Sequence, residues 1–325
     1  MVTHYPRAVV YITESPSENK RRLVSKKMVN NPRGEIAVEE YLSMDPELRL
    51  IWIYCVVDAA VRSIVGNMRM RQRGPSPDLT DVEVLTIEIW GEMKQLPSDA
   101  AIWRSAVTEL KAWFPHIGTE YNFVRRGANL IHLKKKILEL LFGPSADWNA
   151  FDGLPLSVCK NVRAGRDKRF QGEAAWSFCA AKDEWYYGFK AGFLMNSNNE
   201  IFRCWIGPAN VDEREMLLCT AVGMSGLLLA DKGLISAELE GLLAGEGIYL
   251  TVPYRKNMPD DRPRWVLRQA MRLRRRIETA FGGLVQWFGI TRTNGRDFWR
   301  WSARILRKIL AYDLFLRFER DFPLV

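Results

Sequence analysis

The chain has 325 residues, of which 47% are hydrophobic and 26% are charged, and its 47 Lys and Arg exceed its 38 Asp and Glu by nine. This composition excludes an intrinsically disordered chain and indicates two or so folded regions with hydrophobic cores. No apolar run is long enough to cross a bilayer and the N-terminus lacks a signal-peptide pattern, so we expect a cytoplasmic protein without membrane contact.

The residue types also limit the chemistry. The five cysteines are scattered in apolar surroundings and form no CxxC pair, which is typical of reduced packing residues rather than of a zinc site. The three histidines are also scattered, and no HExxH or GxSxG motif is present. Any catalysis must therefore use carboxylates, and the excess of positive charge indicates a polyanionic partner such as nucleic acid.

Residues 1–45 form the first segment, which contains six Lys and Arg between Lys20 and Arg33. Its polar composition with Pro, Asn and Ser predicts a mobile arm. Two interpretations stand side by side, a basic arm that lies along a nucleic-acid backbone and a solvated tail.

Residues 46–145 have the periodicity of successive helices. Thr80 predicts a capping box with Glu83, and Ser98 predicts another N-cap. A last helix is expected from Thr119 to Phe142. Its basic residues, predicted to face outward, are Arg125, Arg126, Lys134, Lys135 and Lys136. A helical DNA-binding domain and a helical surface kept soluble by Lys fit this pattern equally well.

From about residue 146 the period changes from 3.6 to 2. Residues 148–159 predict one strand, and residues 183–207 predict two long strands joined by an Asn-rich turn. Short strands at 226–231 and 248–254 alternate with helices, which indicates parallel neighbours. Two helices, 264–288 and 296–318, complete the chain. The predicted fold is α/β, with a mixed sheet of three antiparallel and two parallel strands flanked by helices.

Three acids occupy unusual positions. Asp152 interrupts an apolar strand, Asp231 ends a buried parallel strand, and Glu278 lies at the border of the apolar face of a basic helix. If the first and fourth predicted strands are neighbours, the three carboxylates can converge at one end of the sheet. A cluster of like charges usually marks a divalent cation, and Mg²⁺ suits carboxylate ligands best.

Each acid also has a structural interpretation. Asp152 can cap a turn, Asp231 can be the N-cap of the next helix, and Glu278 can pair with Arg274 four residues earlier. Periodicity does not choose between these alternatives for any single acid, but together they require three separate coincidences.

The sequence around these acids resembles a known family. The segments FDGLPLSVCKN, YYGFKAGF, GPANVDEREML, LLADKGLIS and RRRIETAFGGLVQWF resemble DDE transposases of bacterial insertion sequences, and the most similar branch is the nine-eighty-two family. Upstream, LTDVEVLTIEIWGEM and YNFVRRGANL resemble the helical region of the same branch. A broader signature has Tyr, Arg and Lys around the Glu, where this chain has Met271, Arg274 and Val285, so only the Arg agrees.

The resemblance implies a ribonuclease-H-like catalytic domain over residues 146–325, preceded by a helical DNA-binding domain over residues 46–145. It implies a transposase that binds the terminal inverted repeats of an insertion sequence, cleaves the ends by metal-dependent hydrolysis and joins the 3′-hydroxyl to target DNA. Asp152, Asp231 and Glu278 would be catalytic and would hold two Mg²⁺ ions, which Mn²⁺ can replace. The partners would be double-stranded DNA and a second copy of the chain, in the bacterial cytoplasm at the nucleoid.

Two basic blocks flank these acids. Residues 255–276 carry 9 − 2 = +7 and residues 160–170 carry 5 − 1 = +4, which is what a channel for DNA phosphates requires. Each block taken singly is equally typical of a solvated surface. The predicted DNA contacts are Lys160, Arg163, Arg166, Lys168, Arg169, Lys182, Lys190, Arg255, Lys256, Arg268, Arg272, Arg274, Arg275, Arg276, Arg125 and Arg126.

Two other functions remain open. The chain can be a DNA-binding regulator of transposase descent without catalysis, which would bind DNA and not nick it. It can also be a metal-dependent nuclease of the same fold, which would cleave element ends and never join them to a target.

Overall fold

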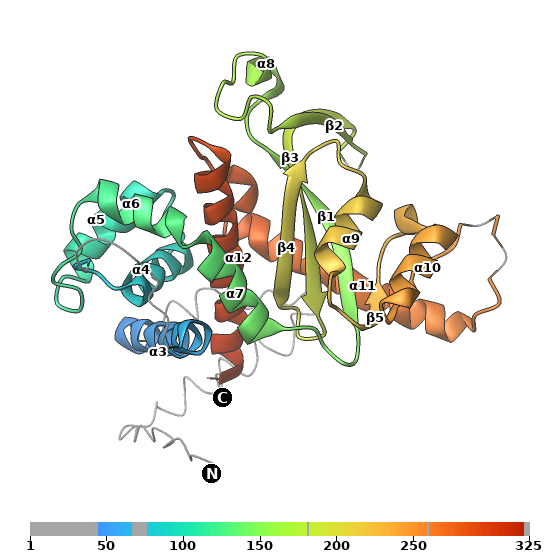
Figure 1. Ribbon diagram of the computed structural model, residues 1–325, viewed down its shortest axis with the longest axis horizontal. Helices are drawn as coiled ribbons and strands as arrows, with labels where there is room; N and C mark the ends of the chain where they lie inside the picture. The colour runs from blue at the N-terminus through green and yellow to red at the C-terminus, as the bar shows by residue number, and fades with distance from the viewer. Residues whose placement is uncertain (1–44, 67–76, 181, 256, 259, 322–325) are drawn as a thin grey trace, which may run out of the picture.

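The described part of the polypeptide begins with helices and continues into a mixed sheet, and its last helix lies between these two parts (Figure 1). The computed structural model describes residues 45–66, 77–180, 182–255, 257–258 and 260–321. The predicted basic arm, apart from Asp45, lies outside the described residues, so its role stays a prediction.

The N-terminal part is built from five described helices. They are α3 (Pro46–Val65), α4 (Asp81–Met93), α5 (Asp99–Glu109), α6 (Glu120–Asn129) and α7 (Ile131–Phe142). Both predicted caps are confirmed: Thr80 and Glu83 form a reciprocal capping box at the start of α4, and the Ser98 hydroxyl accepts from the Ala101 N–H at the start of α5.

The prediction of one helix from Thr119 to Phe142 is wrong, because the chain turns at Leu130 between α6 and α7. Lys134 was also expected on an outer face, yet it is buried. Its ammonium donates to the Gly127 carbonyl oxygen at 2.8 Å and lies 2.7 Å from a Glu88 carboxylate oxygen on α4. A tertiary ion pair therefore offsets the cost of burying this charge.

The sheet contains the five predicted strands and one more. Its strands are β1 (Asn149–Ser157), β2 (Ala175–Cys179), β3 (Glu184–Asn196), β4 (Ile201–Pro208), β5 (Gly226–Leu229) and β6 (Ile248–Thr251). The meander β1, β3, β4 is antiparallel, while β5 is parallel to both β1 and β6. The predicted mixed sheet is thus confirmed, including the contact between its first and fourth strands, and β2 is an addition that pairs with the start of β3.

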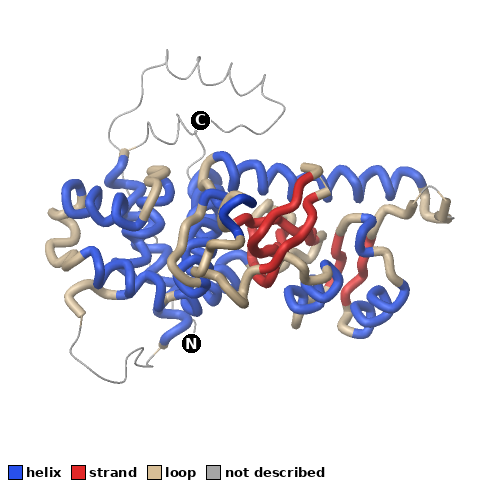
Figure 2. Tube along the Cα trace, turned by 90° about the horizontal axis from the view of Figure 1, so that it is seen from above, coloured by secondary structure: helices blue, strands red, loops and turns tan. Residues whose placement is uncertain are grey.

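Helices lie on both sides of the strands (Figure 2). In this part of the chain they are α8 (Asn161–Ala164), α9 (Glu213–Ala221), α10 (Ala237–Gly245), α11 (Arg264–Gln286) and α12 (Phe298–Asp321), with the short 3-10 helices η1 (Lys232–Leu234) and η2 (Ile290–Arg292). Of these, α11 packs on β1 and β5, so the helix that carries Glu278 covers the strands associated with the other two acids.

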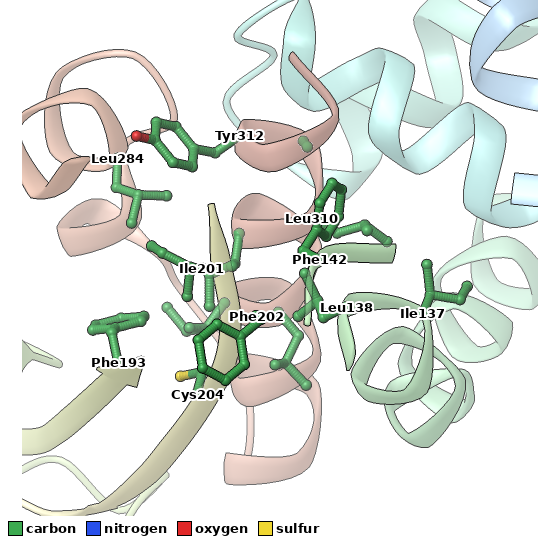
Figure 3. Packing of buried hydrophobic residues seen from close by; sticks show 14 of the residues in the cluster. Ile137, Leu138, Phe142, Phe193, Ile201, Phe202, Cys204, Leu284, Leu310 and Tyr312 are labelled. Carbon is green, nitrogen blue, oxygen red and sulfur yellow. The ribbon is translucent and has the colours of Figure 1, made fainter. Parts of the chain in front are cut away.

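A continuous hydrophobic core joins the helical part to the sheet. Helix α12 packs on α4 and α7 on one side and on β4 and α11 on the other. Figure 3 shows Leu310 of α12 beside Phe142 of α7, with Phe202 of β4 in the same cluster. Residues on both sides of the predicted boundary at residue 145 therefore share one core, and the division into domains stays a prediction.

Buried charges also tie α12 to the helical part. The Arg307 guanidinium, which is 4% exposed, contacts carboxylate oxygens of three acids. These are Glu88 at 3.1 Å, Glu92 at 2.6 Å and Asp99 at 2.9 Å.

No helix within the described part of the chain is long and apolar enough to cross a membrane.

Candidate active site

Two of the predicted acids are brought together by strand pairing. In the parallel pair of β1 and β5, Ala150 lies opposite Leu229. Asp152 and Asp231 each come two residues after this pair. Since side chains two apart along extended chains share a face, both carboxylates lie at the same place on the same face of the sheet.

The third acid comes from helix α11. Ile277, Phe281 and Leu284 are buried and fix the face that α11 turns to the sheet. Glu278 follows Ile277 directly and lies at the edge of this face, with its side chain 52% exposed. The amphipathic pattern of the helix thus places the carboxylate beside the end of the sheet rather than in the core.

One guanidinium stands among the three carboxylates. Arg274 Nη1 lies 3.5 Å from Asp152 Oδ2, and Arg274 Nη2 lies 3.5 Å from Asp231 Oδ1 and 3.1 Å from Glu278 Oε1. The Arg274 side chain is only 12% exposed. The structure therefore brings all three predicted acids together around the largely buried guanidinium of Arg274.

The structural interpretations of the acids have different outcomes. Among the described residues, the hydrogen bond that Asp152 Oδ1 accepts comes from the N–H of its neighbour Gly153, at 2.8 Å. Asp231 stands at the N-cap position of η1, but its side chain makes no capping hydrogen bond. The pair of Glu278 with Arg274 is present, and it is one arm of the three-acid cluster.

Burial is the main influence on Asp152. It raises the pKa of this carboxyl to about 6, against the opposing effects of the Gly153 N–H and Arg274. The negative charges of Asp231 and Glu213 raise it further. Ionised Asp152 is thus held at a free-energy cost in the metal-free protein, which is the condition under which a carboxylate gains most from an added cation.

This raised pKa predicts how stability depends on pH. A carboxyl whose pKa is higher in the folded state stabilises the fold below its unfolded pKa, near 4, and this contribution is lost as the pH rises through about 6. Asp152→Asn removes the effect. Between pH 4 and 7 in EDTA, we expect its unfolding free energy to shift relative to wild type by at most about 3 kcal/mol in favour of the variant. Urea titrations measure the shift, and the same difference at both pH values would contradict it.

A fourth acid, Glu213, was not predicted. It lies in the first turn of α9, and its Oε1 is 3.5 Å from the ammonium of Lys190 on β3. A methyl group built on Gly153 would be 3.8 Å from the same oxygen, so Glu213 borders the cluster. The sequence signal was weak, because an acid after the N-cap Asp212 is also typical of an ordinary helix start.

The donor set suits a divalent metal ion. Three carboxylates that all approach one cation offer the hard oxygen ligands that Mg²⁺ and Mn²⁺ prefer, and Arg274 is a stand-in for positive charge at that point. In the structure, however, Arg274 lies between the three acids. Among the described residues, no three carboxylate, histidine or cysteine side chains are close enough together to share a metal ion. The residues therefore fit a metal by their chemistry, and holding one requires the carboxylates to close up.

Nine of the predicted DNA contacts are exposed cations for which the described residues show no ion pair with a carboxylate. On α11 they alternate with half-buried positions, and further ones surround α8. These nine residues are Arg125, Lys160, Arg163, Arg166, Lys168, Arg255, Arg268, Arg272 and Arg275. Lys256 lies outside the described residues.

Other predicted contacts are engaged within the protein. Arg126 lies 2.7 Å from Asp81 Oδ1, Arg169 pairs with Asp167 at 2.5 Å, and Lys190 pairs with Glu213. Arg274 is held within the acid cluster, and Lys182 and Arg276 make weaker contacts. Lys182 is 3.9 Å from Glu184, and the Arg276 guanidinium lies over the Trp148 ring at 5.3 Å.

Residues 143–298 match a family model described as a transposase DDE domain. Asp152, Asp231 and Glu278 all lie within this range, and the match supports a DDE transposase. No curated protein matches the chain. Among solved structures, a cryo-EM structure of a piggyBac transposase synaptic complex with hairpin DNA is similar over 85% of this chain and 75% of that one, at 10% identity. Its TM-score is 0.47, a likeness too slight to support an argument.

Proposed function

We propose, from the match of residues 143–298 to a transposase DDE domain, that this protein is a DNA transposase of a bacterial insertion sequence, of the nine-eighty-two branch. It would bind the terminal inverted repeats of its element, cleave them and join the free 3′-hydroxyl to target DNA. The observation that supports this most is the approach of Asp152, Asp231 and Glu278 to one guanidinium, within the residues that match the family model.

In this proposal the three acids are the catalytic centre and hold Mg²⁺ or Mn²⁺. When bound, a pair of such ions stabilises the attacking and leaving oxygens at phosphorus. Asp152 is partly buried on a strand, so its position is fixed by the sheet, whereas the exposed Glu278 side chain has room to move toward the others. Arg274 keeps the carboxylates together before an ion arrives.

The basic residues would hold the DNA. Arg268, Arg272 and Arg275 are exposed on α11, the helix that carries Glu278, so a phosphate backbone along this helix passes the acid cluster. Lys160 and Arg163 present a second group of charges beyond the end of β1. We further propose that two copies of the chain act together on the two element ends, at the bacterial nucleoid.

Strand joining is the test that separates the candidate functions. We expect purified protein with Mg²⁺, pre-cleaved DNA ends from the flanks of its own coding region and a supercoiled target plasmid to yield plasmid covalently joined to the ends. Gel electrophoresis of an end-labelled strand detects the product. Binding without nicking would favour the regulator, and nicking without joined product would favour the nuclease.

A further inference from the structure

The unpredicted strand β2 forms an exposed aromatic surface with β3. In the antiparallel register Trp176 is opposite Tyr187, and Phe178 is opposite Trp185. The ring centroids are 5.6 Å apart in the first pair and 5.7 Å apart in the second. Residues two apart along a strand share a face, so all four rings lie on one face of the pair. We call these four residues the aromatic ribbon.

The hydrophobic core accounts for only one residue of the aromatic ribbon, Tyr187, which packs against it and donates its hydroxyl to the Phe170 carbonyl oxygen. Trp176 is 45% exposed, Phe178 is 46% exposed and Trp185 is 58% exposed, whereas Tyr186 on the opposite face is buried. Leaving three large rings together in water is unfavourable, and contiguous apolar patches of this kind mark interaction sites. The ribbon therefore needs a partner that covers aromatic rings.

The surroundings of the ribbon favour a polyanion. Trp185 and Lys160 line the same hollow of about 700 Å³. A second hollow of about 580 Å³ shares Lys160 and is lined also by Arg163, Arg166 and Lys168. These four cations are exposed, while Asp167 in the second hollow is paired with Arg169. The first hollow is also lined by the negatively charged Glu184, whose carboxylate lies 3.9 Å from the ammonium of Lys182.

The ribbon also lies within reach of the acid cluster. Strand β1 runs from Asp152 to Ser157, and Ser157 is paired with Gly188, next to Tyr187 of the ribbon. Five residues of strand span ~16 Å, which is the length of a few nucleotides of extended DNA. A DNA strand that passes Asp152 can therefore continue along β1 to the ribbon.

We infer that the aromatic ribbon is a stacking platform for unpaired bases of a DNA strand whose phosphates contact Lys160, Arg163, Arg166 and Lys168. The inference rests on the proposed function. In duplex DNA the bases are stacked on each other and offer no face to a protein ring, whereas unpaired bases do. A basic groove beside exposed aromatic rings is the combination that binds single strands, and loss of one stacking ring weakens binding by roughly five- to a hundredfold.

Paired oligonucleotides test this inference. Fluorescence anisotropy would compare one duplex with blunt ends and the same duplex with a five-nucleotide unpaired extension. We expect wild type to bind the extended form more tightly. Trp185→Ala should weaken binding of the extended form about tenfold or more and leave duplex binding within about twofold, while Trp185→Tyr keeps the preference. Tyr249→Ala, which removes an exposed ring on β6, is the matched control.

Fluorescence of 2-aminopurine in the extension gives a second readout, since stacking on Trp185 should quench it in wild type and not in Trp185→Ala. Folding is checked by thermal unfolding, and the Asn161 side chain that donates to the Trp185 carbonyl oxygen keeps its acceptor in the variant. Equal weakening of both DNA forms, or no preference in wild type, would overturn the inference and leave the transposase proposal standing. Absence of all DNA binding would overturn both. A dimer that Trp185→Ala converts to monomer without DNA would assign the ribbon to a second copy instead.

Discussion

Replacing any one of Asp152, Asp231 or Glu278 by its amide is expected to abolish strand cleavage and strand transfer. The amide keeps the size of the side chain and removes the charge that holds a divalent ion. Since such ions supply several kcal/mol of transition-state stabilisation, we expect rates to fall about a thousandfold or more. Cleavage and joining of labelled element ends in Mg²⁺ measure the loss, and gel shifts should show end binding largely unchanged.

A metal-binding readout makes this prediction independent of activity. Mn²⁺ at a hundred times its dissociation constant should stabilise wild type by about 2.7 kcal/mol, and each amide variant should lose most of this gain. Glu238→Gln, which removes an exposed acid on α10, should behave as wild type in both assays. Full Mg²⁺-dependent activity in any purified amide variant would refute the assignment of that residue.

The second large effect is expected on stability, from Arg307 in helix α12. Arg307→Met removes the guanidinium that contacts Glu88, Glu92 and Asp99 in the interior. Burial lowers the pKa of Arg307, but these carboxylates together raise it well above its usual value, so the charge is firmly held. Breaking a buried ion pair from one side costs about 3–5 kcal/mol, and we expect a loss of this size.

Urea unfolding of two further variants tests the cause of the loss. Arg307→Lys keeps the charge but cannot contact three acids through one planar group, so an intermediate loss is expected. Arg317→Met changes a less buried arginine on the same helix and should cost less than about 1 kcal/mol. If Arg307→Met were no more destabilising than Arg317→Met, the cluster would not hold α12 to the helical part.

The sequence predicted the meeting of Asp152 and Asp231 only on the condition that the first and fourth strands are neighbours, and the pairing of β1 with β5 meets that condition. Local patterns predicted the strands themselves, and the helix between the two short strands indicated that β5 and β6 are parallel. The turn at Leu130 and the burial of Lys134 were both missed, and the ion pair that accompanies this burial is with Glu88, which is 46 residues away in the sequence. Strand β2 was missed although Trp176 and Phe178 alternate with Ser177 as in a strand; in the structure both rings face solvent instead of the core.

Glu213 shows the same limit at the site itself. Its position beside Gly153 depends on how α9 packs on β3, and no periodicity in the sequence contains that information. Conversely, the pairing of Arg274 with Glu278 was expected from their spacing of four residues, but its simultaneous contacts with Asp152 and Asp231 required the folded sheet.

The contacts of Arg274 have a consequence for the order of events on DNA. Three ionised acids alone would present a charge of −3 to an approaching phosphate, and the guanidinium reduces this to −3 + 1 = −2. A polyanion entering the metal-free site therefore meets weaker repulsion than the acids alone would cause. For the proposed transposase, we therefore expect docking of the substrate and arrival of the ions to be separable steps, with DNA held by the metal-stripped protein and cleavage beginning only when the ions are supplied.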